Sequence, residues 1–119
     1  MDNKLNNPAQ MCTPEQCKSI AKEAFSNVEI FKNKESIKKQ AKMFQALGNE
    51  VRLKILSLLA VQELCICNIV EAIEGSNSTI AHHLKKLEEG EWITSRRDGK
   101  FTIYRLNRIQ AERHRIFKQ

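Results

Sequence analysis

The sequence contains no long run of apolar residues. No stretch approaches the roughly 18 apolar residues that a membrane-spanning helix needs, and the opening MDNKLNNPAQ lacks the apolar centre of a secretory signal. Internal repeats and low-complexity segments are also missing from the 119 residues, so one folded domain is expected. These absences predict a soluble, cytoplasmic protein with no membrane partner.

The sequence also lacks the motifs of enzymes that use thiols. It has four cysteines but no C-x-x-C pair, and no nucleophile stands beside an evident base. We therefore expect neither an enzyme nor a small-molecule substrate. A thiol enzyme or a metal carrier is the alternative from another functional class, and turnover of a thiol substrate would support it.

The net charge of +6 is concentrated near the C-terminal end of the chain. Residues 1–91 hold 12 Lys/Arg and 12 Asp/Glu, whereas residues 92–119 hold 8 Lys/Arg and 2 Asp/Glu. A local positive potential attracts phosphates, so this distribution indicates contact with nucleic acid. A solvated basic face is the alternative.

Hydrophobic spacing predicts several helices and one β-hairpin. After an irregular arm over residues 1–17, helices are expected at 18–31, 36–47, 49–59, 65–73 and 78–89, β-prone runs at 92–97 and 100–106, and a last helix from 107 to the end. The Asp98-Gly99 dipeptide favours a two-residue hairpin turn. The last helix has too few apolar groups to be buried in so small a domain, which makes it the candidate dimerisation element.

The order of these elements is that of a winged helix domain. Two short helices joined by a turn at Gly75 form a helix-turn-helix pattern, and the basic hairpin follows them. We expect a mainly α-helical fold with a β-hairpin wing (α+β), a winged helix-turn-helix that forms a homodimer. Residues 1–34 would be an N-terminal arm with a possible helix, and residues 35–119 the DNA-binding domain with its dimerisation helix.

The helix expected at residues 78–89 has a face suited to reading DNA. If Ile80, Leu84 and Leu87 face the core, the opposite side presents short polar residues followed by bases, which fits the major groove of double-stranded operator DNA. The basic hairpin would contact the neighbouring backbone or minor groove. The predicted DNA-binding residues are Ser76, Asn77, Ser78, Thr79, His82, His83, Lys85, Lys86, Arg96, Arg97 and Lys100. The alternative is an amphipathic helix with solvated lysines, and a flank histidine such as His83 is more often packed within its domain.

The four cysteines form two pairs, Cys12 with Cys17 and Cys65 with Cys67. The cytosol keeps thiols reduced, so permanent disulfides are not expected. Residues two apart do not share a helical face, so Cys65 and Cys67 can bind one ion only near a helix end, where the sequence places them. A helix N-terminus also lowers the pKa of a thiol and so favours the thiolate that binds metal.

Two thiolates rarely complete a site for a soft metal, and Cys12 and Cys17 are the obvious source of more. A set of three or four sulfur ligands selects cadmium, lead, zinc, bismuth or trivalent arsenic over hard cations. Three alternatives to a metal site stay open. Cys65 and Cys67 could fill the core, the four thiols could form a redox switch, or the arm cysteines could be incidental.

Three stretches of the sequence resemble the ArsR/SmtB family of metal-responsive repressors, over residues 35–106. The segment ALGNEVRLKILSLL (46–59) is similar to the helix before the family's helix-turn-helix. The segment SNSTIAHHLKKLEEGEWI (76–93) is similar to the family's turn and recognition helix. ELCIC (63–67) resembles the metal-binding box and is the most specific of the three. The resemblance implies a winged-helix repressor that senses metal.

The arrangement of the cysteines resembles that of the CadC-type sensors in this family. Arsenic sensors typically carry a cysteine three places after the box, where this chain has Val70, whereas CadC-type sensors carry a cysteine pair on the arm. The resemblance implies that cadmium, lead, zinc or bismuth is held by Cys12, Cys17, Cys65 and Cys67, with the arm of one subunit reaching the box of the other.

The sequence departs from the family pattern at the box and the arm. Asn68 stands where the box commonly continues with Asp, and four residues, including Pro14, separate the arm cysteines. The family's second metal site uses carboxylates and histidines on the last helix. Only Glu112 and His114 are available there, two apart and on different faces, so the resemblance implies that this chain lacks the zinc site.

These observations lead to one hypothesis. The metal-free dimer sets two recognition helices about 34 Å apart, on successive half-sites of a palindromic operator. Metal bound at the start of the helix-turn-helix then opposes that geometry. A repressor of the same fold that responds to arsenite or to thiol oxidation is the alternative.

Overall fold

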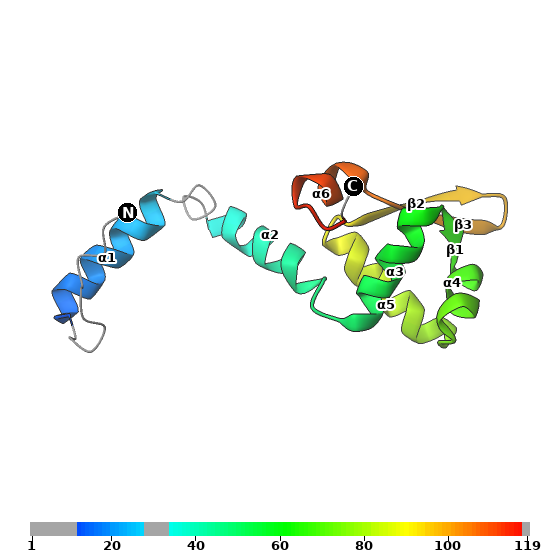
Figure 1. The fold of residues 1–119 in the computed structure, drawn as a ribbon, viewed down its shortest axis with the longest axis horizontal. Helices are drawn as coiled ribbons and strands as arrows, with labels where there is room; N and C mark the ends of the chain where they lie inside the picture. Colours follow the sequence, from blue (N-terminus) through cyan, green and yellow to red (C-terminus); the bar gives the residue numbers. More distant parts are fainter. Residues whose placement is uncertain (1–11, 28–33, 118–119) are drawn as a thin grey trace. The chain divides into compact units, whose positions relative to one another are not determined.

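The computed structural model describes residues 12–27 and 34–117, and the chain divides into two compact units, residues 1–37 and 38–119 (Figure 1). The first 11 residues of the expected arm, and the end of the helix expected at 18–31, lie outside the described residues. Among the described helices, none combines the length and the apolarity that crossing a membrane requires.

The first unit contains the helix α1 (Pro14–Asn27), which begins four residues earlier than the sequence analysis expects. Pro14 takes the first helical position, where its missing N–H costs nothing. Thr13 and Gln16 form a reciprocal cap, since the Gln16 N–H donates to Thr13 Oγ1 (3.1 Å) and the Thr13 N–H donates to Gln16 Oε1 (2.8 Å). The prediction of an irregular chain up to residue 17 is therefore wrong from Pro14 onward.

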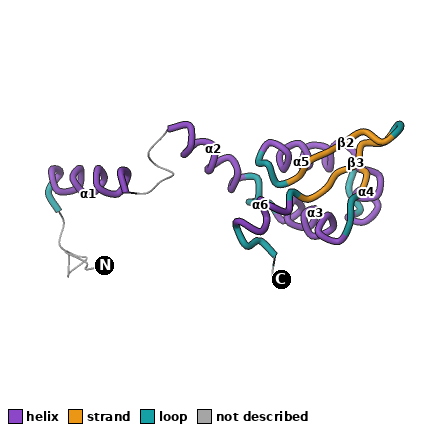
Figure 2. Tube along the Cα trace, turned by 90° about the horizontal axis from the view of Figure 1, so that it is seen from above, coloured by secondary structure: helices purple, strands orange, loops and turns teal. Residues whose placement is uncertain are grey.

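The other elements follow a helix-turn-helix and hairpin order (Figure 1). They are α2 (Lys34–Gln45), α3 (Glu50–Val61), β1 (Leu64–Cys65), α4 (Ile66–Ile73), α5 (Asn77–Glu89), β2 (Ile93–Asp98), β3 (Phe101–Leu106) and α6 (Arg108–Arg113). Helices α4 and α5 form the helix-turn-helix, and β2 with β3 form the wing, drawn as adjacent orange strands in Figure 2. The expected fold class, mainly α with a β-hairpin wing, is confirmed.

The sheet has a third strand that the sequence analysis misses. The strand order is β1-β3-β2 and all pairs are antiparallel, with Leu64 opposite Tyr104 and Cys65 opposite Ile103. A strand of two residues has no hydrophobic period of its own, because its pairing is decided by a partner almost 40 residues away. The strand attaches the start of α4 to the wing.

The core of the second unit is closely packed. Its fully buried side chains include Trp92, Ile55, Leu56, Leu59, Ile69, Ile80, Leu84, Leu87 and Ile93. The Trp92 indole N–H donates to the carbonyl of Met43 (2.7 Å), so the largest core side chain has its polar atom satisfied. Gly90 lies against this indole, where a Cβ would come within 3.0 Å of Trp92 Cδ1.

The hairpin turn and the last helix both differ from the sequence-based expectation. Asp98 pairs with Phe101, so the two turn residues are Gly99 and Lys100, and Gly99 has a positive φ of 62°. Helix α6 ends at Arg113 instead of continuing to the end of the described residues. Beyond it Ile116 is partly buried against the core, so the prediction of a long, unburied helix is wrong. The chain turns back because its apolar C-terminal residues can be covered by their own domain.

Candidate thiol site and nucleic-acid interface

Helix α5 begins with a well-formed cap. The Ser76 hydroxyl accepts the Thr79 N–H (3.2 Å) and donates to Thr79 Oγ1 (2.8 Å), which ties two of the predicted DNA-binding residues to each other. Helical geometry buries Ile80, Leu84 and Leu87 on the inner side. The predicted residues that remain exposed on this helix and its cap are Ser76, Asn77, Ser78, Thr79, His82, Lys85 and Lys86.

His83 does not belong with these exposed residues. Its side chain is buried, and its Nδ1 accepts a hydrogen bond from Arg52 Nε on α3 (3.1 Å). Burial, followed by the positive charges of Arg52 and His82, lowers the pKa of His83 and keeps the imidazole neutral. His83 is therefore the one predicted DNA-contact residue on this helix that is not exposed, because its place one position round the helix turns it toward the domain.

The wing residues predicted to contact DNA are held by neighbouring side chains. Arg96 forms an ion pair with Glu63 (2.6 Å), and Arg97 donates to Thr102 Oγ1 (3.1 Å) across the hairpin. The Lys100 ammonium lies 5.8 Å from the centre of the Phe101 ring. The Glu63–Arg96 pair joins the residue before β1 to the wing.

The pair Cys65 and Cys67 lies at the start of α4. Cys65 ends β1 and caps the helix, and it is largely buried, whereas Cys67 in the first turn is exposed. Asn68 Oδ1 accepts the backbone N–H of Cys65 (3.2 Å) and also the Cys65 thiol (3.0 Å). The Asn that replaces the family's Asp thus holds this cysteine without adding a negative charge.

The two sulfur groups of this pair interact directly. A hydrogen bond from Cys67 is the main cause that lowers the pKa of Cys65, against the effect of burial and with help from the Asn68 N–H. The same hydrogen bond is the main cause that raises the pKa of Cys67. Two adjacent sulfur groups are therefore available for a soft metal ion, and Cys65 is the one whose pKa shifts toward the thiolate form.

The second predicted pair, Cys12 and Cys17, lies in the first unit. The structure joins the two residues in a disulfide, with their Cα atoms 6.1 Å apart. This bond differs from the reduced thiols expected from the sequence. Across the described residues, no group of three or more His, Cys, Asp or Glu side chains is gathered around a common point.

A groove of about 690 Å³ connects Cys65 and Cys67 with the predicted DNA-contact elements. Its other lining residues are Ile66, Asn77, Ser78, Ala81, Lys100, Phe101, Thr102 and Tyr104, from α4, α5 and the wing. Phe101 and Tyr104 are not predicted from the sequence as neighbours of the thiols, because only the β1–β3 pairing brings the hairpin to this position.

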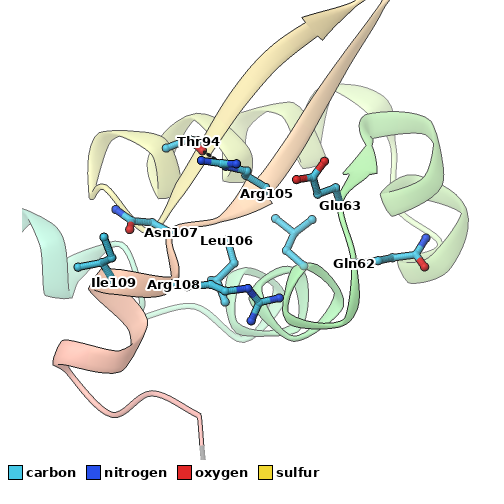
Figure 3. A pocket seen from close by; sticks show the side chains of 9 residues that line it. Gln62, Glu63, Thr94, Arg105, Leu106, Asn107, Arg108 and Ile109 are labelled. Carbon is cyan, nitrogen blue, oxygen red and sulfur yellow. Dashed lines mark hydrogen bonds between the residues drawn. The ribbon is translucent and has the colours of Figure 1, made fainter.

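A second hollow, of about 410 Å³, lies between the end of α3, the hairpin and the start of α6 (Figure 3). Arg105 donates to Thr94 Oγ1 (3.3 Å) and Arg108 donates to the Ala60 carbonyl (3.1 Å), while Glu63 also lines the hollow. Both cationic side chains, Arg105 and Arg108, and the carboxylate of Glu63 line this hollow. The hollow therefore lacks the single sign of charge that marks a contact with phosphates.

His114, one of the two residues considered for the family's second metal site, packs among aromatic rings. Its ring centre lies 5.2 Å from that of Phe44 and 5.5 Å from that of Trp92, both in edge-on geometry. The absence of a zinc site stays a prediction. The contacts of His114 give it a structural role in the second unit.

Known proteins resemble this chain in its central region. The model of the family described as bacterial regulatory protein, arsR family, matches residues 49–94. The arsenical resistance operon repressor of Staphylococcus aureus is 39% identical over 72 residues, which are 60% of this chain and 69% of that protein. A cadmium resistance transcriptional regulatory protein CadC homolog of the same species is 38% identical over 68 residues, 56% of each chain.

The fold is also found among solved structures. The homodimeric winged helix-turn-helix DNA-binding domain of a possible ArsR-family regulator from Mycobacterium bovis is similar, with a TM-score of 0.62 and 31% identity over 66% of this chain and 72% of that one. Cys65 and Cys67 lie within the family match, whereas Cys12 and Cys17 lie outside it. The chain belongs to the arsR family of bacterial regulatory proteins, which are DNA-binding winged helix-turn-helix repressors of transcription and not enzymes.

Proposed function

We propose that the protein represses transcription as a homodimer on operator DNA and is released when a thiophilic metal ion binds its cysteine thiolates. The observation that carries this proposal is the double position of Cys65, which pairs with the wing strand β3 and also caps α4. A metal bond to its sulfur acts on the wing and on the helix-turn-helix together. DNA is bound by Ser76, Asn77, Ser78, Thr79, His82, Lys85, Lys86, Arg96, Arg97 and Lys100.

The thiol pair has the chemistry that a soft cation requires. The pKa of Cys65 is lowered and Cys67 lies within hydrogen-bond reach of it, so one ion can bind both sulfurs once they have lost their protons. Cys12 and Cys17, once reduced, supply the remaining thiolates. Residues 1–34 thus act as the arm that provides ligands and residues 35–119 as the DNA-binding domain, with cadmium, lead, zinc or bismuth as the effector.

The homodimer is supported by apolar surface on the second unit. Ile109 on α6 is 71% exposed and Phe44 on α2 is 48% exposed, and each stands beside buried neighbours. The similar domain from Mycobacterium bovis is described as homodimeric. We propose that a second copy covers these residues and that the dimer acts on DNA in the cytoplasm.

Fluorescence anisotropy of a labelled operator duplex tests the proposal. Saturating cadmium should weaken operator binding about 5- to 150-fold, the usual range for coupled sites. Cys65→Ser should remove this response, and Ser57→Ala, an exposed serine on α3, is the matched control. Operator affinity that stays unchanged at saturating cadmium, lead, zinc and arsenite would contradict metal release.

A redox-responsive repressor is the second candidate, and the Cys12–Cys17 disulfide favours it. Oxidation by hydrogen peroxide removes two electrons and two protons from two thiols, and the peroxide becomes two waters. This candidate expects peroxide to release the operator in metal-free buffer and a dithiol reductant to restore binding. The Cys12→Ser variant, which cannot form the bond, would keep its operator under peroxide.

A further inference from the structure

The groove beside the thiols has walls from three elements that the chain places far apart in sequence. Cys65 and Cys67 form the wall at the start of α4, Asn77 and Ser78 lie at the start of α5, and the wing contributes Lys100 and its neighbours. Cys67, Asn77, Ser78 and Lys100 are all exposed. The thiol pair and the residues proposed to bind DNA therefore open onto one surface.

The side chains along this groove match a sugar-phosphate backbone. Asn77, Ser78 and Lys100 offer hydrogen-bond donors and a positive charge for phosphate oxygens. Phe101 is 48% exposed at the tip of the wing, an apolar ring that deoxyribose carbons could cover. Among residues 12–27 and 34–117, none of those that line the groove is acidic, in contrast with the hollow that contains Glu63.

We infer that this groove receives one strand of the operator's sugar-phosphate backbone, which places Cys67 in the DNA contact surface. The inference rests on the proposed function and deepens it. Metal bound at Cys67 and DNA bound in the groove then act at one surface. A divalent ion with three or four thiolates brings a net negative charge to where the phosphates pass.

Protection of Cys67 from alkylation tests the inference on the full, reduced chain. The probe is the duplex that the metal-free protein selects from a random-sequence library, and the reagent is iodoacetamide in the presence of a chelator. Peptide mass spectrometry follows Cys67 and the two arm cysteines in one sample. With the duplex present, the alkylation rate of Cys67 should fall in proportion to the remaining free protein, whereas Cys12 and Cys17 should react at their original rates.

An adduct placed at Cys67 supplies a second measurement. In a chain carrying Cys12→Ser, Cys17→Ser and Cys65→Ser, a bulky maleimide on Cys67 should abolish duplex binding, and a small methylthio group should weaken it less. The matched control adds Cys67→Ser and Ala72→Cys. Position 72 is exposed on the same helix, five residues on and therefore about 140° round from position 67. The same maleimide there should leave the affinity close to that of the unmodified control.

Three results would overturn the inference. Cys67 could be alkylated at the same rate in the complex, its bulky adduct could bind DNA as tightly as the free thiol, or the adduct at position 72 could be equally harmful. Each of these leaves metal release of the operator intact. Failure to select any duplex would instead contradict the proposed function, and the inference with it.

Discussion

The two units of the chain differ in how they are stabilised. Helix α1 has no buried residue, and the Thr13–Gln16 cap, the Cys12–Cys17 disulfide and backbone hydrogen bonds stabilise it. The second unit buries a core around Trp92 and satisfies the polar atoms within it. An isolated helix of this length is only marginally stable in water. The difference teaches that tertiary packing stabilises the second unit, whereas helix α1 relies on contacts between residues near in sequence.

The largest expected effect comes from removing core volume. Ile55→Ala on α3, where the side chain is fully buried, should lower the free energy of unfolding by about 2–5 kcal/mol. Ile20→Ala on α1, where the side chain is 52% exposed, should change it by less than about 0.5 kcal/mol. Urea unfolding of both variants measures the contrast. Equal losses would mean that α1 contributes to a shared core.

Tight packing around Gly90 gives the next effect. A Cβ at this position would lie 2.9 Å from the Ala46 Cβ, so Gly90→Ala should cost about 1–3 kcal/mol of unfolding free energy. Gly48→Ala is the matched control, because its Cβ would meet only the Gln45 carbonyl at 3.4 Å. Thermal unfolding compares the two. If both variants melt alike, close contact at Gly90 does not limit the packing.

Removing the arm thiols should change the metal response and leave the core alone. The double variant Cys12→Ser/Cys17→Ser should lose most of the coupling between cadmium and operator, about 1–3 kcal/mol, while the melting of the second unit stays the same. Ser19→Ala, on the same exposed helix, should keep the full response. Anisotropy titrations with cadmium measure both. A normal cadmium response in the double variant would exclude the arm as a source of ligands.

Acidification should give the smallest effect and act on the second unit alone, since α1 contains no histidine. The folded state lowers the pKa of His83 below the usual 6.5. Stability from the neutral ring is therefore complete above pH 6.5 and is lost as pH falls through the folded pKa, because the unfolded chain takes up the proton first. Melting temperature against pH measures this loss, and His83→Gln should flatten the curve. An identical curve in the variant would assign it to other groups.

Local patterns in the sequence predict most of the fold. The apolar spacing of Ile80, Leu84 and Leu87 gives the inner face of α5, and Asp98-Gly99 locates the wing to within one residue. The start of α1 could also be predicted from the sequence, because Thr13 and Gln16 on either side of Pro14 form the Thr-x-x-Gln pattern of a helix cap. The two prolines and the polar residues before it favour an irregular arm instead.

The parts that escape prediction depend on contacts between distant residues. Three contacts join residues about 30 to 40 positions apart: the pairing of β1 with β3, the Glu63–Arg96 ion pair and the Arg52–His83 hydrogen bond. No local pattern in the sequence indicates such contacts. The candidate site also has one part that local patterns predict and one part that they do not. The sequence names Cys65 and Cys67, whereas the groove that joins them to Phe101 follows from how the strands pair.

The shortness of β1 has a further consequence for how copies of the protein behave side by side. A sheet edge with unpaired backbone groups invites other chains to add a strand, and this sheet ends on β1 at one side and β2 at the other. β1 offers only two residues, and β2 carries the neighbouring cations Arg96 and Arg97. Repressors crowded along one promoter are thus protected against joining wing to wing.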